Sequence, residues 1–253
     1  MSGILYGIGT GPGDAELMTL KAVKCLKQVD IIALPISDKT FQKTVAGKPQ
    51  DLGTAEKYIQ NATAFQIAYQ NVPEMLQKEF LLLPMPMMKE KETLKKIHDE
   101  AAEAVAKKLL EGKNIGFLTL GDPTIYSTYL YIHNRIVAKG LMAEIINGIP
   151  SFCAAAAKLN TGLVENKDML HIFPASYGIQ ELEQYPGTKV LMKSGKKLSK
   201  VREELAKKKQ NAMMVENCGM VGEKVYKDVS EIPDTGSYYS LIVIYLTILL
   251  FIF

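Results

Sequence analysis

The sequence predicts an α/β protein of two α/β domains, with a mainly parallel sheet in the N-terminal domain and a mixed sheet in the C-terminal domain. First, short apolar runs alternate with longer amphipathic stretches through residues 1–150, as in parallel sheets whose strands are joined by helices. Second, the apolar runs lie closer together in residues 151–253, which indicates a different kind of sheet. Third, a chain of 253 residues that is 47% hydrophobic can bury two ordinary cores.

The expected elements of the first domain alternate along the chain. Apolar runs bounded by glycine, proline or polar residues predict strands at 3–9, 31–35, 79–83, 115–120 and 143–146. Apolar residues at helical spacing predict helices at 17–28, 55–70 and 93–111. The stretch 37–52, which contains Gly47 and Pro49, is predicted to be a polar connection without regular structure.

The second domain is expected to contain more strands and fewer helices. Its predicted strands are 170–173, 189–193, 212–216, 223–227 and 239–244, and its predicted helix is 198–209. Because ligands often bind between two domains, we expect a cofactor cleft between residues 1–150 and 151–253.

The segment 115–128 reads as a buried strand followed by a ligand-binding loop. A buried parallel strand ends at Leu120, and ligands of open α/β sheets bind beyond the carboxyl ends of the strands. Gly121 allows the backbone to approach a bound molecule closely, and Asp122 adds a polar group. The alternative is that Asp122 only caps a helix, with Pro123 at its first position.

A second loop, Gly7–Asp14, has the same arrangement of a strand followed by glycines, a proline and an aspartate. Its glycines suggest the dinucleotide-binding motif, which requires a third glycine inside a helix and an acidic residue after the next strand. Pro12 interrupts the helical position, and the strand 31–35 ends in Leu-Pro. The sequence therefore disfavours a nicotinamide site.

The composition indicates which kinds of binding partner and which cellular compartment to expect. The formal net charge of +3 is too small to indicate nucleic acid as a partner. The three cysteines are widely spaced, which predicts neither a zinc site nor a disulfide framework and fits a reducing cytoplasm. No signal peptide is readable, and the apolar run 241–253 is shorter than the roughly 20 residues of a membrane span. We expect it to be a buried strand with an extension, not a membrane anchor.

The two loops resemble those of the tetrapyrrole methylases of corrin synthesis, the class III methyltransferases that use S-adenosylmethionine. Residues 9–14 match the superfamily loop, and residues 118–128 match the version found in C20-methyltransferases of precorrin-2 or cobalt-factor II. Segments 82–85 and 147–157 resemble further parts of that subgroup, so the resemblance covers residues 3 to about 243. Two departures are Pro150, where the family usually has Gly-Ile-Thr-Ser or similar, and the apolar tail beyond Ile244.

The resemblance implies methyl transfer from S-adenosylmethionine to C20 of precorrin-2 or cobalt-factor II in cobalamin biosynthesis, with S-adenosylhomocysteine as product and no protein-bound metal. It implies a tetrapyrrole side in residues 1–150, a cofactor side in residues 151–253, and a homodimer that acts on a small molecule and binds no membrane. Alternatives are another superfamily enzyme, such as a uroporphyrinogen III methyltransferase or a diphthine synthase, and a non-catalytic nucleotide-binding module.

The resemblance also implies roles for individual residues. The positions implied to bind the cofactor are Pro35, Leu120, Gly121, Asp122, Ile125, Tyr126, Ser127, Thr128, Ser151, Phe152, Met192, Asn217, Cys218, Ser240 and Leu241. Met192 is implied to form part of the adenine pocket, which the segments 216–218, beginning at Glu216, and 240–241 complete. Taken without the resemblance, Ile125, Phe152 and Met192 are ordinary core residues, and Thr128 and Ser151 are helix caps.

The remaining implied positions concern the tetrapyrrole. Those on its side are Gly11, Pro12, Gly13, Asp14 and Lys193. Asp14 and Tyr126 are the candidate catalytic residues, because C20 must lose a proton after methylation and a nearby acid-base group would accept it. The alternative for Asp14 is that it caps the helix that follows.

Overall fold

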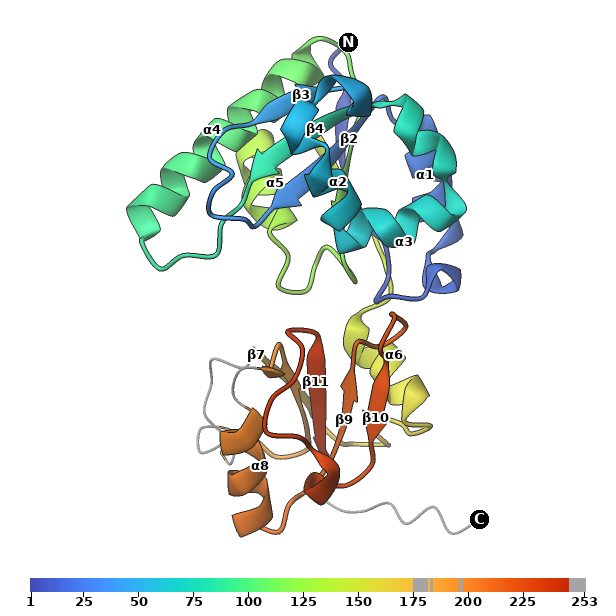
Figure 1. Ribbon diagram of the computed structural model, residues 1–253, viewed down its shortest axis with the longest axis vertical. Helices are drawn as coiled ribbons and strands as arrows, with labels where there is room; N and C mark the ends of the chain where they lie inside the picture. The colour runs from blue at the N-terminus through green and yellow to red at the C-terminus, as the bar shows by residue number, and fades with distance from the viewer. Residues whose placement is uncertain (175–181, 183, 196–197, 246–253) are drawn as a thin grey trace. The chain divides into compact units, whose positions relative to one another are not determined.

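The computed structural model describes residues 1–174, 182, 184–195 and 198–245, and the chain divides into two compact units, Met1–Pro150 and Ser151–Phe253 (Figure 1). Each unit contains one β-sheet with helices packed on it. The predicted α/β fold class, with a mainly parallel sheet first and a mixed sheet second, is therefore confirmed.

The N-terminal unit is built on a six-stranded sheet in the order β3-β4-β2-β5-β1-β6. Its strands are β1 (Ile4–Gly9), β2 (Ile31–Ile36), β3 (Val45–Gly47), β4 (Glu79–Pro84), β5 (Ile115–Thr119) and β6 (Met142–Ile146). Only β3 runs antiparallel to its neighbour, so the carboxyl ends of the other five strands lie at the same edge. The loops that follow β1, β5 and β6 therefore meet there.

Helices cover both faces of this sheet (Figure 1). On one face lie α1 (Leu20–Gln28), α2 (Lys57–Asn61) and α3 (Thr63–Asn71); on the other lie α4 (Lys91–Leu110) and α5 (Tyr129–Ala138). Short 3₁₀ turns complete the unit: η1 (Ala15–Leu17), η2 (Pro49–Asp51), η3 (Gly53–Ala55) and η4 (Pro73–Gln77). In β2, Ile32 and Leu34 face the first group and Ile31 faces the second, because successive side chains of a strand point to opposite faces.

The C-terminal unit is built on a five-stranded mixed sheet in the order β10-β9-β11-β8-β7. The strands are β7 (Leu170–Pro174), β8 (Thr188–Met192), β9 (Asn211–Glu216), β10 (Lys224–Tyr226) and β11 (Ser240–Tyr245). Only β7 and β8 are parallel, and β11 runs antiparallel to both β8 and β9. The carboxyl ends of β8 and β9 therefore lie beside the amino end of β11.

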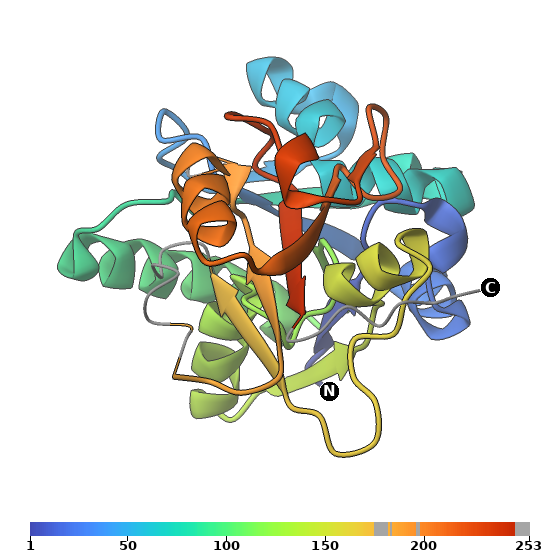
Figure 2. The same ribbon diagram turned by 90° about the horizontal axis from the view of Figure 1, so that it is seen from below.

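Two helices pack on opposite sides of these strands (Figure 2). Leu198, Val201 and Leu205 of α8 (Leu198–Lys207) pack with η6 (Val229–Glu231) in one core. The other helix, α6 (Ser151–Lys158), contacts β9 and β11.

Most predicted elements are present, but two predictions are wrong, and so is the alternative in which Asp122 caps a helix. The helix expected at 55–70 is two helices, because the backbone is extended at Ala62 between α2 and α3. The connection 37–52 contains the short strand β3, which pairs with β4. Asp122 and Pro123 do not begin a helix, since α5 begins only at Tyr129.

The apolar end of the chain forms a strand where the structure describes it. Leu241–Ile244 are buried in β11 between β8 and β9, which confirms the predicted buried strand. The expected extension, residues 246–253, lies outside the described residues. Among the helices that the structure describes, none is both long and apolar enough to cross a membrane.

Candidate functional site

The loops after β1 and β5 pair with each other at the carboxyl edge of the N-terminal sheet. The Gly11 amide donates to the Gly121 carbonyl at 3.3 Å, and the Gly121 amide donates back to the Gly11 carbonyl at 2.7 Å. Both residues have positive φ angles, +77° and +72°, which glycine adopts without strain. The two loops singled out in the sequence therefore form one structure.

The carboxylate of Asp122 joins this pair to the loop after β6. Asp122 is only 5% exposed. One of its oxygens accepts hydrogen bonds from the amide (2.7 Å) and hydroxyl of Thr124. The other accepts from the Asn147 side chain at 3.1 Å and from the Gly148 amide at 3.0 Å. Asp122 thus holds together segments that are 25 residues apart in the sequence.

These bonds also set the charge of Asp122. Burial by itself would raise the pKa of this carboxyl, but the hydrogen bonds from Thr124, Asn147 and Gly148 outweigh burial and hold the pKa below its ordinary value. Asp122 is therefore a carboxylate at neutral pH. Since both of its oxygens already accept bonds from the protein, we expect its side chain to act by fixing the loops.

The loops after β1 and β6 approach so closely that a side chain does not fit between them. A β-carbon added to Gly148 would lie 2.1 Å from the Gly121 carbonyl oxygen, and one added to Gly9 would lie 2.5 Å from the Gly148 nitrogen. Glycine at these positions lets the three loops come together. Gly9, Gly121 and Gly148 are all buried, so the loops are joined by direct backbone contacts.

The rest of the β5–α5 loop places polar side chains next to these glycines. Ser127 forms a hydrogen bond of 3.2 Å with the hydroxyl of the buried Thr119 and accepts another from the Tyr129 amide. Tyr126 is 48% exposed and has a φ of +47°, which is unusual for a bulky residue. Such strained residues concentrate at functional sites. Thr128 occupies the N-cap position of α5, but its side chain makes no capping hydrogen bond.

The residues expected on the tetrapyrrole side occupy the β1–α1 loop. Gly11, Pro12 and Gly13 are buried, and Asp14 is half-buried. The Asp14 carboxylate accepts a hydrogen bond of 2.9 Å from the Glu16 amide, so it caps η1. The capping alternative for Asp14 is therefore observed, and its second oxygen takes no part in this cap.

Several residues of this edge were not singled out for a role by the sequence. Thr19 caps α1 and also donates to the Asn147 carbonyl, which ties the start of that helix to the β6 loop. Thr10 is fully buried and donates to the Thr119 carbonyl. The sequence placed Asn147 and Gly148 after a predicted strand, in the segment 147–157 that resembles the family, but gave neither residue a role.

The site residues predicted in the C-terminal unit gather at one edge of its sheet. Met192 ends β8, Asn217 follows β9, and Ser240 begins β11. Leu241 is directly opposite Met192, and Ser240 is opposite Glu216. Lys193 and Asn217 both have positive φ angles, and the Lys193 ammonium lies 5.7 Å from the centre of the Tyr238 ring.

The remaining predicted residues are distributed as follows. Pro35 is half-buried in β2 near its carboxyl end, and Leu120 and Ile125 are half-buried in the β5–α5 loop. Ser151 begins α6 and is followed by the buried Phe152, and Cys218 is buried after β9. None of the three cysteines, all of which the structure describes, is in a disulfide.

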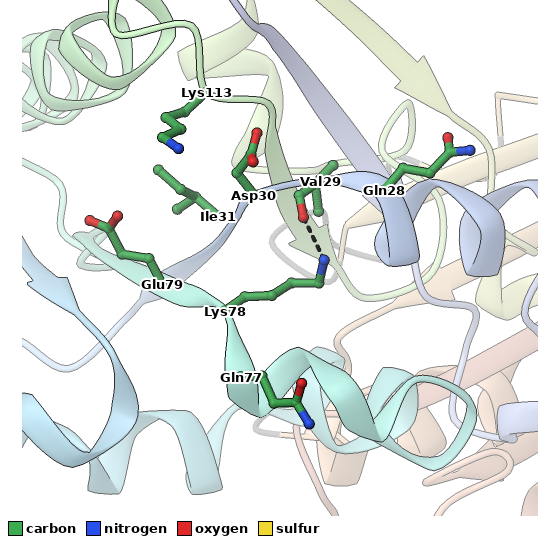
Figure 3. Close-up of a pocket in the computed structure, with 8 residues that line it drawn as sticks. All are labelled: Gln28, Val29, Asp30, Ile31, Gln77, Lys78, Glu79 and Lys113. Atoms are coloured by element: carbon green, nitrogen blue, oxygen red, sulfur yellow. Dashed lines mark hydrogen bonds between the residues drawn. The ribbon is translucent and has the colours of Figure 1, made fainter.

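A separate pocket of about 420 Å³ lies at the opposite edge of the N-terminal sheet, at the amino ends of β2 and β4 (Figure 3). Three of its charged groups have partners in the fold. The Lys78 ammonium donates to the Val29 carbonyl at 2.5 Å, Asp30 accepts from the Asn114 amide, and Glu79 pairs with Lys108. These bonds close the end of α1 and join neighbouring strands, so this pocket is structural.

In the described residues, no group of three His, Cys, Asp or Glu side chains is arranged to hold a metal ion. The two edges instead offer backbone amides and carbonyls, hydroxyl groups and apolar side chains. Such groups recognise an organic molecule through hydrogen bonds and apolar contact.

Two C20-methyltransferases are similar to this chain over most of its length. A "Probable cobalt-precorrin-2 C(20)-methyltransferase" of Methanocaldococcus jannaschii is 36% identical over 190 residues, which are 75% of this chain and 72% of that protein. A "Precorrin-2 C(20)-methyltransferase" of Sinorhizobium sp is 30% identical over 96% of this chain and 97% of that protein. The chain spans about half the length of another relative, "Cobalamin biosynthesis protein CobIJ" of Mycobacterium tuberculosis, of which it covers 45% at 28% identity.

Solved structures have the same fold. The structure of uroporphyrin-III C-methyl transferase from Thermus thermophilus complexed with S-adenyl homocysteine matches with a TM-score of 0.62 at 16% identity, covering 96% of this chain and 98% of that one. The sequence also matches the family Tetrapyrrole (Corrin/Porphyrin) Methylases over residues 4–233. The chain therefore belongs to the tetrapyrrole (corrin/porphyrin) methylase family.

Proposed function

We propose that this protein transfers a methyl group from S-adenosylmethionine to C20 of precorrin-2 or of its cobalt complex, in the biosynthesis of cobalamin. The observation that carries the proposal is the likeness to two relatives whose names state the same C20 reaction, at 36% and 30% identity. The match to the second of them extends over 97% of its length.

The residues present fit the proposed methyl donor. The donor is a zwitterionic amino acid joined to a nucleoside, and backbone amides, carbonyls and hydroxyls are its natural hydrogen-bond partners. The N-terminal unit brings Gly9, Gly121 and Gly148 together at the carboxyl edge of its sheet, next to the half-buried Ser127 and Thr128. The C-terminal unit offers the half-buried Met192 and Asn217 beside Ser240. That these two edges share one cofactor cleft stays a prediction.

When bound, S-adenosylmethionine supplies an activated methyl group on a sulfonium and leaves as the thioether S-adenosylhomocysteine. The task of the protein is to orient the reacting atoms. Holding a nucleophilic carbon and the methyl group about 3 to 3.5 Å apart in line can lower the barrier by about 7 to 11 kcal/mol. We assign this role to the loops fixed by Asp122, because rigid loops position a ligand more accurately than mobile ones.

A proton must leave C20 after the methyl group is attached. The two candidates to accept it are Asp14 and Tyr126, as the sequence predicted. Asp14 uses one carboxylate oxygen to cap η1, and Tyr126 is exposed in a strained conformation. If Asp14 is the base, Asp14→Asn lowers kcat at unchanged donor affinity; turnover equal to that of the wild type would remove Asp14 from this role.

The test of the proposed function is incubation with labelled S-adenosylmethionine and precorrin-2, with and without cobalt, followed by mass spectrometry of the product. We expect one methyl group to be added to the tetrapyrrole in at least one of the two arms. Transfer to uroporphyrinogen III or to a protein acceptor, with no reaction in either arm, would contradict the C20 proposal.

The oligomeric state and compartment are part of the same proposal. From the family resemblance we propose a homodimer, which light scattering distinguishes from a single chain by mass. A cytoplasmic location suits three cysteines that form no disulfide. Because the proposed substrate carries several carboxylates, the exposed Lys193 is proposed to meet one of them.

A further inference from the structure

A buried carboxylate lies at the candidate edge of the C-terminal unit. Glu216 ends β9 and is 8% exposed, and it is the one Asp or Glu buried to this degree among the described residues of that unit. One carboxylate oxygen accepts a hydrogen bond of 2.5 Å from the Ser237 amide, and the other accepts one of 3.3 Å from the Tyr226 hydroxyl. Both bonds come from chain segments outside β9.

The bond to Ser237 fixes the segment that leads into β11. The same segment is attached to the ends of both neighbouring strands: the Asn217 amide donates to the Tyr239 carbonyl at 3.1 Å, and the Ser194 amide donates to the Ser240 carbonyl at 3.2 Å. The Ser240 hydroxyl closes the turn by donating to the Ser237 carbonyl at 2.7 Å. The conformation of residues 236–240 therefore sets the positions of Asn217 and Ser240 relative to each other.

Packing leaves little freedom at this point. A β-carbon added to Gly236 would lie 2.6 Å from Leu198 of α8, 3.1 Å from the Ser240 hydroxyl oxygen and 3.3 Å from the Glu216 carboxylate. One added to Gly195 would lie 2.0 Å from the Ser237 carbonyl oxygen. The bond between the Ser237 amide and Glu216 is part-buried, and an amide shielded from water is costly without its acceptor, so an acceptor at position 216 helps to hold this segment in place.

We infer that Glu216 is a positioning residue for the methyl donor: by holding the Ser237 amide it shapes the edge formed by Met192, Asn217 and Ser240, which receives the nucleoside end of S-adenosylmethionine. The inference rests on the proposed function. Glu216 acts through the segment 236–240, by accepting a hydrogen bond at the right distance, and its negative charge is not what the donor recognises.

Two conservative substitutions distinguish the effect of the position of the Glu216 acceptor oxygen from the effect of its negative charge. Glu216→Gln keeps the side-chain length: its amide oxygen can accept from the Ser237 amide while its amino group donates to the Tyr226 oxygen. Glu216→Asp keeps the charge but withdraws the carboxylate from Ser237 by one methylene. Tyr226→Phe is the matched control, because it removes only the second, longer bond.

The measurement is the affinity of each full-length variant for S-adenosylhomocysteine by calorimetry, with donor KM and kcat determined alongside. We expect Glu216→Gln and Tyr226→Phe to stay within about threefold of the wild type, and Glu216→Asp to bind at least tenfold more weakly, with a raised donor KM and a kcat at saturation close to that of the wild type. Hydrogen exchange at the Ser237 amide should be faster in Glu216→Asp only.

Full affinity in Glu216→Asp, or loss of affinity in Glu216→Gln, would overturn the inference and indicate a role for the charge or none at all. Failure of the proposed function has a different signature, because the wild-type protein itself would then not bind S-adenosylhomocysteine. In that case the inference falls together with the proposal on which it rests.

Discussion

At the scale of single residues, Asp122 connects the sequence motif to the geometry of the candidate site. The sequence drew attention to Asp122 because it follows a glycine at the end of a buried strand. Its hydrogen bonds show a structural role, because they connect the loop after β5 to the loop after β6. We therefore expect the side chain to affect ligand binding through the loops.

Replacing Asp122 with alanine tests this role. Asp122→Ala leaves the buried Gly148 amide without an acceptor, which should lower the free energy of unfolding by about 1 to 3 kcal/mol. We expect the affinity for S-adenosylhomocysteine to fall at least tenfold in calorimetry. Asp228→Ala is the control: Asp228 makes a similar local bond to the Ser230 amide, but it is exposed and joins no second loop. Equal affinity in both variants and the wild type would refute the role of Asp122.

The lowered pKa of Asp122 predicts how stability depends on pH. In the unfolded chain Asp122 has its ordinary pKa of 3.8, whereas in the folded protein its pKa is lower. Asp122 therefore contributes its full share of the free energy of unfolding above pH 3.8, and this share is lost as the pH falls through the lower folded pKa. Asp122→Asn should therefore show a shallower loss of stability below about pH 4 in denaturant titrations. An acid limb identical to that of the wild type would contradict this prediction.

At the scale of elements, the candidate site exists because parallel strands deliver their loops to one edge. The order of strands places β1 between β5 and β6, and this neighbourhood lets Gly9 touch Gly148 and Gly11 pair with Gly121. The close contact between these loops requires residues without a side chain at these positions. A single methyl group at the contact should separate the loops.

Gly148→Ala is the direct test of this contact. Its β-carbon would lie 2.1 Å from the Gly121 carbonyl oxygen, so backbone must shift, and such overpacking typically costs about 1 to 3 kcal/mol. We expect a lower denaturation midpoint and weaker binding of S-adenosylhomocysteine. Gly47→Ala serves as control in the same unit, because its nearest neighbours are side-chain atoms at 3.4 and 3.7 Å. Unchanged midpoint and affinity in Gly148→Ala would exclude a tight loop contact.

Strands and long helices were predictable because apolar periodicity is a local signal. The run 31–36 and the helix 91–110 were found within one or two residues of their ends. The break at Ala62 was not, because the apolar pattern continues across it; there the Gln66 side chain bonds to the Gln60 carbonyl. The strand β3 has three residues, too few for a pattern, and it depends on pairing with β4.

The candidate site was predictable in part for the same reason. Gly121, Asp122 and Asp14 stood out because each lies in a loop with a recognisable local pattern. The partners of Asp122 did not, since Asn147 and Gly148 are brought to it only by the pairing of β1 with β5 and β6. The contacts of Glu216 likewise depend on the register between β9, β10 and β11.

At the scale of the whole molecule, both units contain residues of the proposed site. The family match extends over residues 4–233, which includes most of each unit. The predicted site residues are also divided: the glycine loops and Asp122 lie in the N-terminal unit, and Met192, Asn217 and Ser240 lie in the C-terminal unit. We therefore expect the complete chain to be needed for methyl transfer.

The proposed function predicts the carbon to which one methyl group is attached, and carbon NMR measures that position directly. The full-length protein would be incubated with precorrin-2, with and without cobalt, and S-adenosylmethionine carrying ¹³C in its methyl group. We predict a single new labelled methyl signal, bonded to C20 of the macrocycle. A labelled methyl group on any other carbon, or no transfer by folded protein that binds S-adenosylhomocysteine, would contradict it.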